Sequence, residues 1–341
     1  MREKRRRGQG TNAVTLEAVA EIAKVSTITV SRILRNKGPI AEATRDRVMA
    51  AVRAVGYVPN RIAGSLASAG SNLMGVLIPS LSNIVFPEVL RGIHDALEQS
   101  GFQPVVGVTD YNMDAEERLV HSLLEWKPAA LIITGFDHTM ATRRMLKQTD
   151  IRVVELMDID SAPIDLAVGM SHHSAGYDTG KYLIEKGYRR FGYVGHNWSV
   201  DQRARLRYEG LAKALAEAGL SILDEALVDG PSSTLAGRDM LSQLLARKRT
   251  LDVVVFSNDD MAVGGVFHCN SAHIELKTGL ALFGFNGLEL GQALPVPLST
   301  IRSNRYLIGK IAVEKIISEP HRGTAPGIID TGYEIIAGGT A

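Results

Sequence analysis

The segment VTLEAVAEIAKVSTITVSRIL, residues 14–34, predicts two short helices with almost no turn between them. In its first half, the apolar residues recur at the spacing of one helix face, at Leu16, Val19, Ala20 and Ala23. Ser26 is suited to cap a second helix, whose inward stripe we expect to be Val30, Ile33 and Leu34. Two helices joined by a turn of about three to four residues predict a helix-turn-helix.

The second helix leaves a largely polar face open to solvent, formed by Thr27, Ile28, Thr29, Ser31 and Arg32. In a helix-turn-helix this helix enters the DNA major groove with its N-terminal residues on the base edges. Small hydroxyl residues allow a close approach and donate to phosphates, and Arg32 is long enough to reach O6 and N7 of guanine. The alternative interpretation is a small helical subdomain or a dimerisation arm.

A third helix is expected at about residues 44–55, with Thr44 as its cap, and would complete a three-helix bundle.

Charge separates this region from the rest of the chain. Residues 1–70 contain 13 Lys and Arg against 5 Asp and Glu, and the whole chain contains 38 and 37, which leaves 25 and 32 for the remainder. A basic head on an acidic body suggests that only the head binds nucleic acid.

After residue 72, short β-branched runs alternate with longer amphipathic stretches. This alternation is typical of βαβ units, whose parallel sheet is covered by helices on both faces. More than 250 residues of this pattern is too much for one small sheet, so we expect an α/β core of two doubly wound parallel-sheet lobes.

Several common functional motifs are missing from the sequence. No GxGxxG or GxxxxGK[ST] loop follows a predicted strand, and GxSxG, HExxH and paired CxxC are also missing. We therefore predict no cofactor, no metal and no enzymatic activity. Cys269 is the only cysteine, which favours a reducing compartment. The basic N-terminus precedes no apolar signal segment, and no apolar run approaches the roughly 20 residues that span a bilayer, which favours a cytoplasmic protein with no membrane partner.

The headpiece segment, together with GYVPNRIAGSLA at residues 56–67, resembles the DNA-binding headpiece and hinge of the LacI/GalR family of bacterial repressors. The α/β remainder resembles that family's periplasmic-binding-protein-like core. Within the family, VVELMD, LAVGM, NDDMAVGGVF and GFNGLELGQ are most similar to the gluconate-operon repressor subgroup. The expected domains are a helix-turn-helix with a basic arm (1–58), a hinge (59–70) and an effector-binding and dimerisation domain (71–341). Lobe one is expected at about 71–171 and 299–326, and lobe two at about 172–298 and 327–341.

The resemblance implies DNA-contacting roles for individual residues. It makes Thr27, Ile28 and Arg32 the base readers and Ser26, Thr29 and Ser31 phosphate contacts. It also makes Leu66 a hinge residue that wedges into the minor groove, with Asn60 and Arg61 beside the DNA backbone.

Three residues depart from the family pattern in this region. Lys24 stands where glycine is common in the turn, so we expect either a strained φ there or a turn of slightly different shape. Ile28 replaces a usual polar reader and offers only apolar contact. Ala41 stands where a hydroxyl cap is common at the third helix, which is why the cap is expected at Thr44.

The ends of the predicted core strands carry a second set of candidate residues. Ligands in such sheets bind outside the carboxyl ends of the strands. The candidates there are Ser80, Asn83, Asp158, Asn258 and Asn286, with Phe86 as a pocket wall or a core residue. Their short carbonyl and amide groups suit a polyhydroxylated ligand, although each could equally be a helix cap or a turn residue.

Arg207 matches the family's effector-binding arginine, whose fork suits a carboxylate or vicinal hydroxyls. Asn286 replaces an Asp that is common in sugar-binding relatives and removes a negative charge from the pocket. The leading hypothesis is therefore a homodimeric transcriptional repressor that binds a pseudo-palindromic double-stranded operator and is controlled by a sugar or sugar-acid effector, such as gluconate. The alternatives are a sugar-binding protein of transport and a sugar-metabolising enzyme.

Overall fold

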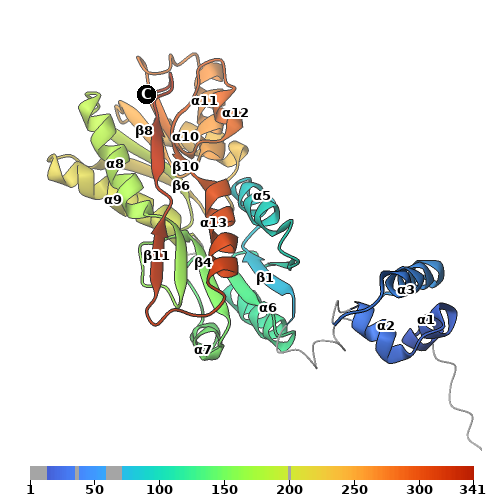
Figure 1. The fold of residues 1–341 in the computed structure, drawn as a ribbon. Helices are drawn as coiled ribbons and strands as arrows, with labels where there is room; N and C mark the ends of the chain where they lie inside the picture. Colours follow the sequence, from blue (N-terminus) through green and yellow to red (C-terminus); the bar gives the residue numbers. More distant parts are fainter. Residues whose placement is uncertain (1–13, 35–37, 59–70, 199–200) are drawn as a thin grey trace, which may run out of the picture. The chain divides into compact units, whose positions relative to one another are not determined.

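The computed structural model describes residues 14–34, 38–58, 71–198 and 201–341 (Figure 1). The chain divides into two compact units, Met1–Ser71 and Asn72–Ala341. Among the described residues, no helix combines the length and apolar character needed to cross a membrane.

The N-terminal unit contains the three expected helices. Their bounds are α1 Leu16–Ala23, α2 Thr27–Leu34 and α3 Glu42–Val55. Each apolar stripe faces the other two helices, and the buried core consists of Val19, Ala20, Ala23, Val30, Ile33, Val48 and Ala51. As expected, the Ser26 hydroxyl accepts a hydrogen bond from the Thr29 amide at 3.2 Å and so caps α2. This cap fixes the start of the helix whose outward face is the candidate DNA reader.

The turn between α1 and α2 depends on Lys24. This residue ends α1 with φ 53° and ψ 47°, in the left-handed region that favours glycine. Its amide still reaches back to the carbonyl groups of the last turn, at Ala20 and Glu21. Of the two alternatives expected for this turn, the structure therefore has the strained φ.

The start of α3 differs from the sequence-based expectation. Thr44 was expected to cap it, but the helix begins at Glu42, with Ala41 at the cap position and no side-chain cap. The Ala41 carbonyl accepts the amides of Thr44 and Arg45 at 2.9 and 3.1 Å, so Thr44 already lies inside the first turn. The prediction was wrong because backbone hydrogen bonds alone start this helix, and its exposed first amides do not require a side-chain partner.

Lobe one of the C-terminal unit is a six-stranded sheet with the order β11-β5-β4-β3-β1-β2, in which all pairs are parallel. Its strands are β1 Leu73–Ile78, β2 Gln103–Val108, β3 Ala130–Thr134, β4 Arg152–Asp158, β5 Leu166–Met170 and β11 Gly327–Asp330. Helices α5 Val85–Leu97 and α13 Arg305–Ser318 pack together on one face, and α6 Met113–Glu125 and α7 Met140–Gln148 cover the other. Because successive strand side chains point to opposite faces, β1 contributes Val76 to one core cluster and Leu77 to the other.

Lobe two is a second six-stranded sheet with the order β12-β10-β9-β8-β6-β7. Its strands are β6 Phe191–His196, β7 Ile222–Val228, β8 Val253–Phe256, β9 Ala281–Asn286, β10 Ser299–Ser303 and β12 Tyr333–Ile336. All pairs are parallel except β10 with β12. Its helices are α8 His172–Glu185, α9 Gln202–Glu217, α10 Thr234–Ala246, α11 Asp259–Ser271 and α12 Glu289–Gln292. The doubly wound, two-lobed fold class is thus confirmed.

Two strands near the C-terminus belong to the other lobe than the one expected from the sequence. Strand β10, expected in lobe one, pairs Ile301 with Phe285 of β9 and so belongs to lobe two. Strand β11, expected in lobe two, pairs Ile328 with Ala167 of β5 and so belongs to lobe one. The chain therefore crosses between lobes after β5, after β10 and after β11. Strand partners far apart in the sequence decide these boundaries, and local composition carries no signal for them.

Candidate effector cleft and DNA-binding face

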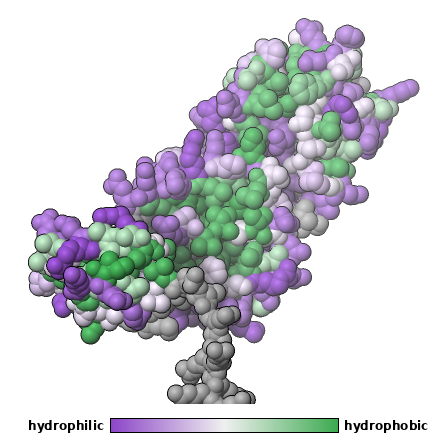
Figure 2. Space-filling model, turned by 90° about the vertical axis from the view of Figure 1, so that its right-hand side faces the viewer, coloured by the Kyte–Doolittle hydropathy of each residue, from purple (hydrophilic) through white to green (hydrophobic). Residues whose placement is uncertain are grey.

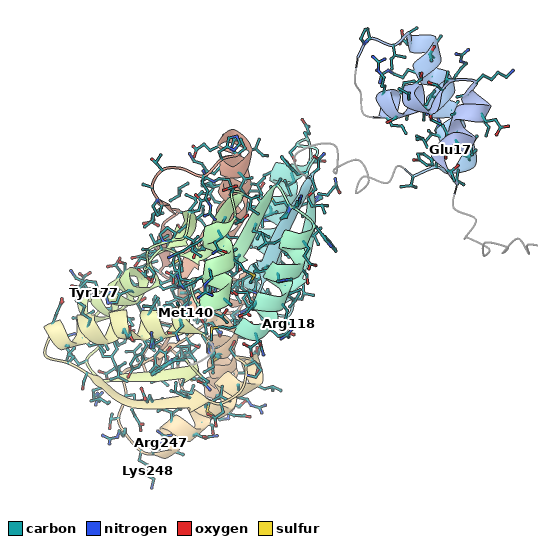
Figure 3. The ribbon with its side chains drawn as sticks, turned by 90° about the horizontal axis from the view of Figure 1, so that it is seen from below. Glu17, Arg118, Met140, Tyr177, Arg247 and Lys248 are labelled. Carbon is teal, nitrogen blue, oxygen red and sulfur yellow. The ribbon has the colours of Figure 1, made fainter. Side chains whose placement is uncertain are left out.

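Close glycine contacts set the position of α9 against α8. A Cβ atom on Gly176 of α8 would collide with the backbone carbonyl of Arg207, and one on Gly210 of α9 would collide with that of His173. The two helices can approach this closely only because both positions lack a side chain. Tyr177, labelled in Figure 3, joins the same pair of helices through a 2.6 Å hydrogen bond from its hydroxyl to Glu217. Arg203 and Arg207, one turn apart on α9, are thereby held in fixed positions.

Most of the Arg207 guanidinium is already occupied by protein groups. Its Nη1 lies 3.1 Å from Nδ1 of His172, its Nη2 donates to the Ser257 carbonyl at 2.9 Å, and its Cζ lies 4.2 Å from the Phe285 ring centroid. Its Nε is buried and has no hydrogen-bond partner within the part of the chain that the structure describes. Arg207 also lines a cavity of about 20 Å³ beside Tyr193, which is room for a water molecule and too little for a sugar.

Arg203 extends from lobe two toward lobe one. Its Cζ lies 5.9 Å from the ring centroid of Phe86 in α5, and its Nε lies 3.5 Å from Oδ1 of Asp201. Burial alone would lower the pKa of Arg203, but Asp201, then Tyr111 and Asp158, raise it above its usual value. Only 13% of the side chain is exposed, and its Nη1 is buried with no partner among the described residues. A buried cation thus bridges the two lobes with one donor group unused.

In lobe one, the loop after β1 is held together by hydrogen bonds. The Ser80 hydroxyl accepts the amides of Ser82 and Asn83, both at 3.2 Å. The Asn83 amide group donates to the Tyr111 hydroxyl at 2.9 Å, and its Oδ1 accepts the Val85 amide at 3.3 Å. Two sequence-predicted residues are therefore brought together here, along with a tyrosine that the sequence reasoning did not select.

Asp158, at the end of β4, is a buried carboxyl close enough to Arg203 for their charges to interact. Burial raises its pKa to about 6, and Asp160 adds to the rise, whereas the Asp160 amide at 2.9 Å and the charge of Arg203 oppose it. This carboxyl therefore changes its charge near neutral pH. It is placed as the sequence predicted.

Three other predicted residues have structural partners. Phe86 is fully buried in the lobe-one core, so its main role is packing. The Asn258 side chain caps α11 by accepting the Met261 amide at 3.1 Å. Asn286 has φ 119°, and its carbonyl accepts a hydrogen bond from Arg305. Asn286 and Asn258 still lie at strand ends of lobe two, but much of their polar capacity serves the fold.

The sequence reasoning missed Arg203, Tyr111 and His172. Arg203 carried a usable signal, because it lies four residues before Arg207 and shares its helix face. Tyr111 follows β2 and was as accessible to the strand-end rule as Ser80. Nothing in the local sequence singles out His172. In the described residues, no group of three or more His, Cys, Asp and Glu side chains could hold a metal ion.

On the N-terminal unit, the outward face of α2 has the expected composition. Ile28 is 71% exposed, Arg32 is exposed, and the Ser26 and Thr29 hydroxyl groups lie 2.9 Å apart. An apolar side chain this exposed on a small bundle is available for a partner surface. The predicted hinge contacts Asn60, Arg61 and Leu66 lie outside the described residues.

A helix-turn-helix unit joined to a two-lobed α/β core with a polar, arginine-bearing cleft defines a ligand-responsive DNA-binding regulator. Family comparisons give the same class. Residues 15–60 match the model of bacterial regulatory proteins of the lacI family, and residues 71–327 match that of periplasmic binding proteins and the sugar-binding domain of the LacI family. The chain belongs to the LacI family of bacterial transcription regulators. It is a DNA-binding transcriptional repressor and not an enzyme.

Individual relatives agree with this assignment over nearly the whole chain. The HTH-type transcriptional regulator GntR of Pseudomonas aeruginosa is 38% identical, covering 96% of this chain and 95% of its own length. GntR of Escherichia coli K12 is 33% identical, with 95% and 98% covered. A LacI-family regulator from Silicibacter pomeroyi of known structure is 43% identical with a TM-score of 0.90, covering 96% of this chain and 99% of that one. The lac repressor dimer bound to operator shares the fold, with a TM-score of 0.83 at 24% identity, covering 96% and 99%.

Proposed function

We propose that this repressor senses a small sugar acid, gluconate or a close relative, and controls genes of gluconate or related carbohydrate metabolism. The observation that carries the proposal is the pair of arginines one turn apart on α9, both in a cleft whose other polar groups are hydroxyl, amide and carboxyl side chains. Hydroxyl and amide groups suit the hydroxyls of the ligand, and a guanidinium suits its carboxylate. The similarity to GntR proteins supports the same ligand class.

The effector site in this proposal lies between the lobes. It comprises the residues expected from the sequence, Ser80, Asn83, Phe86, Asp158, Arg207, Asn258 and Asn286, with Arg203 and Tyr111 added. Its ligand favours one arrangement of the lobes, and operator DNA favours another. Because the coupling between two binding sites is reciprocal, effector and operator then weaken each other by the same factor.

The proposed DNA contacts follow the exposed face of α2. Thr27, Ile28 and Arg32 read bases, and Ser26, Thr29 and Ser31 contact phosphates. The headpiece is residues 1–58, and residues 59–70 form the hinge, in which Asn60, Arg61 and Leu66 contact DNA. The exposure of Ile28 and Arg32 supports this assignment, since both side chains can reach a major groove without rearrangement of the core.

We also propose a homodimer that binds a pseudo-palindromic operator in the cytoplasm, where bacterial DNA is found. Figure 2 shows hydrophobic areas on the side of the core that contains α5 and α11. Exposed apolar side chains near or on these elements include Leu81, Ile84 and Phe267. Large exposed apolar patches typically mark protein interfaces, and a twofold dimer places two helix-turn-helix units on two half-sites.

The proposal is tested by selecting operator sequences with purified protein and then titrating the complex with gluconate and with glucose. Gluconate is expected to change operator affinity at concentrations where glucose does not. A matched selection with Arg32→Ala should relax preference at one base position in each half-site and weaken operator binding by about 1–3 kcal/mol. Equal effects of the two sugars would contradict the sugar-acid effector, and an unchanged selected motif would contradict the role of Arg32.

A further inference from the structure

Arg203 and Arg207 both lie on α9 near the boundary between the lobes, and the surroundings of their guanidinium groups differ. The two Nη atoms of Arg207 have protein partners at 3.1 and 2.9 Å, and Phe285 covers one face of the group. Among the described residues, Nε of Arg207 has no partner, and this residue lines a cavity of only about 20 Å³. Arg207 therefore cannot offer its fork to a carboxylate without giving up contacts within the protein.

Arg203 has the opposite arrangement. Within the described part of the chain, its one close ionic partner is Asp201, at 3.5 Å through Nε, and its buried Nη1 has no hydrogen-bond partner. A buried donor without a partner is costly, and native structures that contain one commonly use it to bind a ligand or water. The end of the Arg203 side chain therefore offers an unused, charged hydrogen-bond donor in the cleft.

Tyr111 lies in lobe one, close enough to the Arg203 guanidinium for the two groups to interact electrostatically. Its oxygen accepts a hydrogen bond from the Asn83 amide at 2.9 Å, which leaves the phenol hydrogen to donate elsewhere. The charge of Arg203 lowers the pKa of Tyr111, although burial outweighs this effect and raises the pKa overall, so the phenol keeps its proton. A guanidinium from lobe two and a phenol donor from lobe one can thus converge on one acceptor.

We propose that Arg203, rather than Arg207, binds the anionic group of the effector, that this group is a carboxylate, and that Tyr111 donates the second hydrogen bond from the opposite lobe. In this arrangement Arg207 is a positioning residue, held by His172, Ser257 and Phe285. The carboxylate joins the two lobes, so the residue that selects the ligand also connects its binding to the arrangement of the lobes. This inference rests on the proposed sugar-acid function.

The charges around Arg203 favour a carboxylate over a phosphate. Asp201 is paired with Arg203 and with Nε2 of His196, and Asp158 adds a further carboxyl. The charges of Arg203 and Arg207 are thus nearly balanced by these two acidic groups. A monoanion adds less repulsion to this set than a phosphate dianion does.

The test is calorimetry with gluconate, glucose and glucose 6-phosphate on the full chain. Arg203→Gln should weaken gluconate binding by about tenfold to a hundredfold and leave glucose binding nearly unchanged, as expected for loss of a charge-assisted hydrogen bond. Tyr111→Phe removes one hydroxyl only and should weaken gluconate selectively by a smaller factor, about fivefold. Arg207→Lys should instead weaken gluconate and glucose alike, because it disturbs the lobe-two wall.

Arg205→Gln is the matched control. Arg205 lies on the same helix, is about half exposed and pairs with Glu209 at 3.5 Å, so its loss should leave all three affinities unchanged. Operator binding without effector checks that each variant is folded. Should Arg203→Gln fail this check, Arg203→Lys and Tyr111→Phe decide the assignment through the ratio of gluconate to glucose affinity.

The outcomes separate this inference from the proposed function. Wild-type binding of gluconate that Arg203→Gln leaves intact, or that falls in parallel with glucose, overturns the role of Arg203 while the sugar-acid effector stands. A wild-type preference for glucose 6-phosphate that disappears in Arg203→Gln overturns the carboxylate. Failure of the wild type to bind any sugar acid overturns both.

Discussion

His172 accepts a hydrogen bond from Arg207, whose Nη1 lies 3.1 Å from the ring Nδ1. An arginine can only donate, so Nδ1 must be unprotonated, and the Nε2–H group then donates to the Met157 carbonyl at 2.9 Å. The hydrogen bond from His172 to Met157 connects the start of α8 in lobe two with the end of β4 in lobe one. Burial, then Arg207 and Arg203, hold the pKa of His172 well below its usual value, so the ring is neutral at physiological pH.

The neutral His172 makes stability depend on acid pH. Its pKa is lower in the folded state than in the unfolded chain, where it is about 6.5. The unfolded chain therefore takes up a proton that the folded one does not, and stability falls as the pH drops below about 6.5. We expect the unfolding midpoint to fall between pH 7 and pH 5, and His172→Gln to reduce this slope. Identical slopes for the two proteins would contradict the assignment.

Because of His138, we expect the folded protein also to lose stability as the pH rises into the basic range. Its Nδ1 lies 2.7 Å from Glu116 and its Nε2 lies 3.4 Å from Glu155, with both ring nitrogens buried in lobe one. Burial lowers the pKa of His138, but the hydrogen bond to Glu116 and the nearby carboxylate of Glu155 outweigh it and raise the pKa to about 9. The charged ring stabilises the fold by up to about 3 kcal/mol below pH 6.5, and this stabilisation is lost as the pH rises through about 9.

Chemical denaturation of the full chain between pH 6 and pH 10 measures this effect. The wild type should lose stability across the range, and His138→Gln should start less stable but change less. Exposed His121, which lies 3.6 Å from Glu125 at the surface, provides a control: His121→Gln should follow the wild-type curve. A wild-type stability that is constant from pH 6 to pH 10 would exclude a protonated His138.

Asp158 should couple effector binding to protons. Burial and the charge of Asp160 raise the pKa of this carboxyl to about 6, and the charge of Arg203 opposes this rise. A bound carboxylate nearby raises it further, so binding takes up a proton. Gluconate affinity should therefore rise as the pH falls from 8 toward about 6 and then level off, with at most about a tenfold change per pH unit. In Asp158→Asn this dependence should vanish, and its persistence there would point to another titrating group.

We expect that replacing Lys24 with glycine stabilises the headpiece. Its left-handed backbone, with φ 53°, costs a residue that has a Cβ about 1 kcal/mol. Lys24→Gly should relieve this strain and increase the protection of α1 and α2 amides from hydrogen exchange. Lys24→Ala removes the same charge but keeps the Cβ, so it should give no increase. Equal protection in both variants would show that charge, and not backbone strain, is responsible.

The features that could be predicted from the sequence depend on neighbours in the chain. Helix faces follow from residues three and four positions apart, and a cap such as Ser26 acts within its own turn. The strand-end rule also placed Ser80, Asn83 and Asp158 at one edge of lobe one, because every parallel strand of that sheet ends there.

The predictions that failed, and the residues that were missed, depend on distant partners. The expected cap at Thr44 was wrong because the Ala41 carbonyl starts α3 without one. The lobe boundaries were wrong because β10 and β11 join sheets through strands far away in the sequence. Their own residues do not reveal which sheet edge will accept them.

By itself, the sequence determined the helix-turn-helix, the two-lobed α/β core and the set of polar residues at the strand ends, since periodicity and turn chemistry act over a few residues. Only the tertiary structure decided which of two arginines on one helix face has its guanidinium group hydrogen-bonded within the protein. Arg207 is held by His172 and Ser257, which lie 35 and 50 residues away along the chain, whereas Nη1 of Arg203 has no partner within the described chain. Whether a donor is free depends on which groups the fold brings within hydrogen-bond distance, and that distance is set by packing between lobes and helices rather than by spacing along the chain.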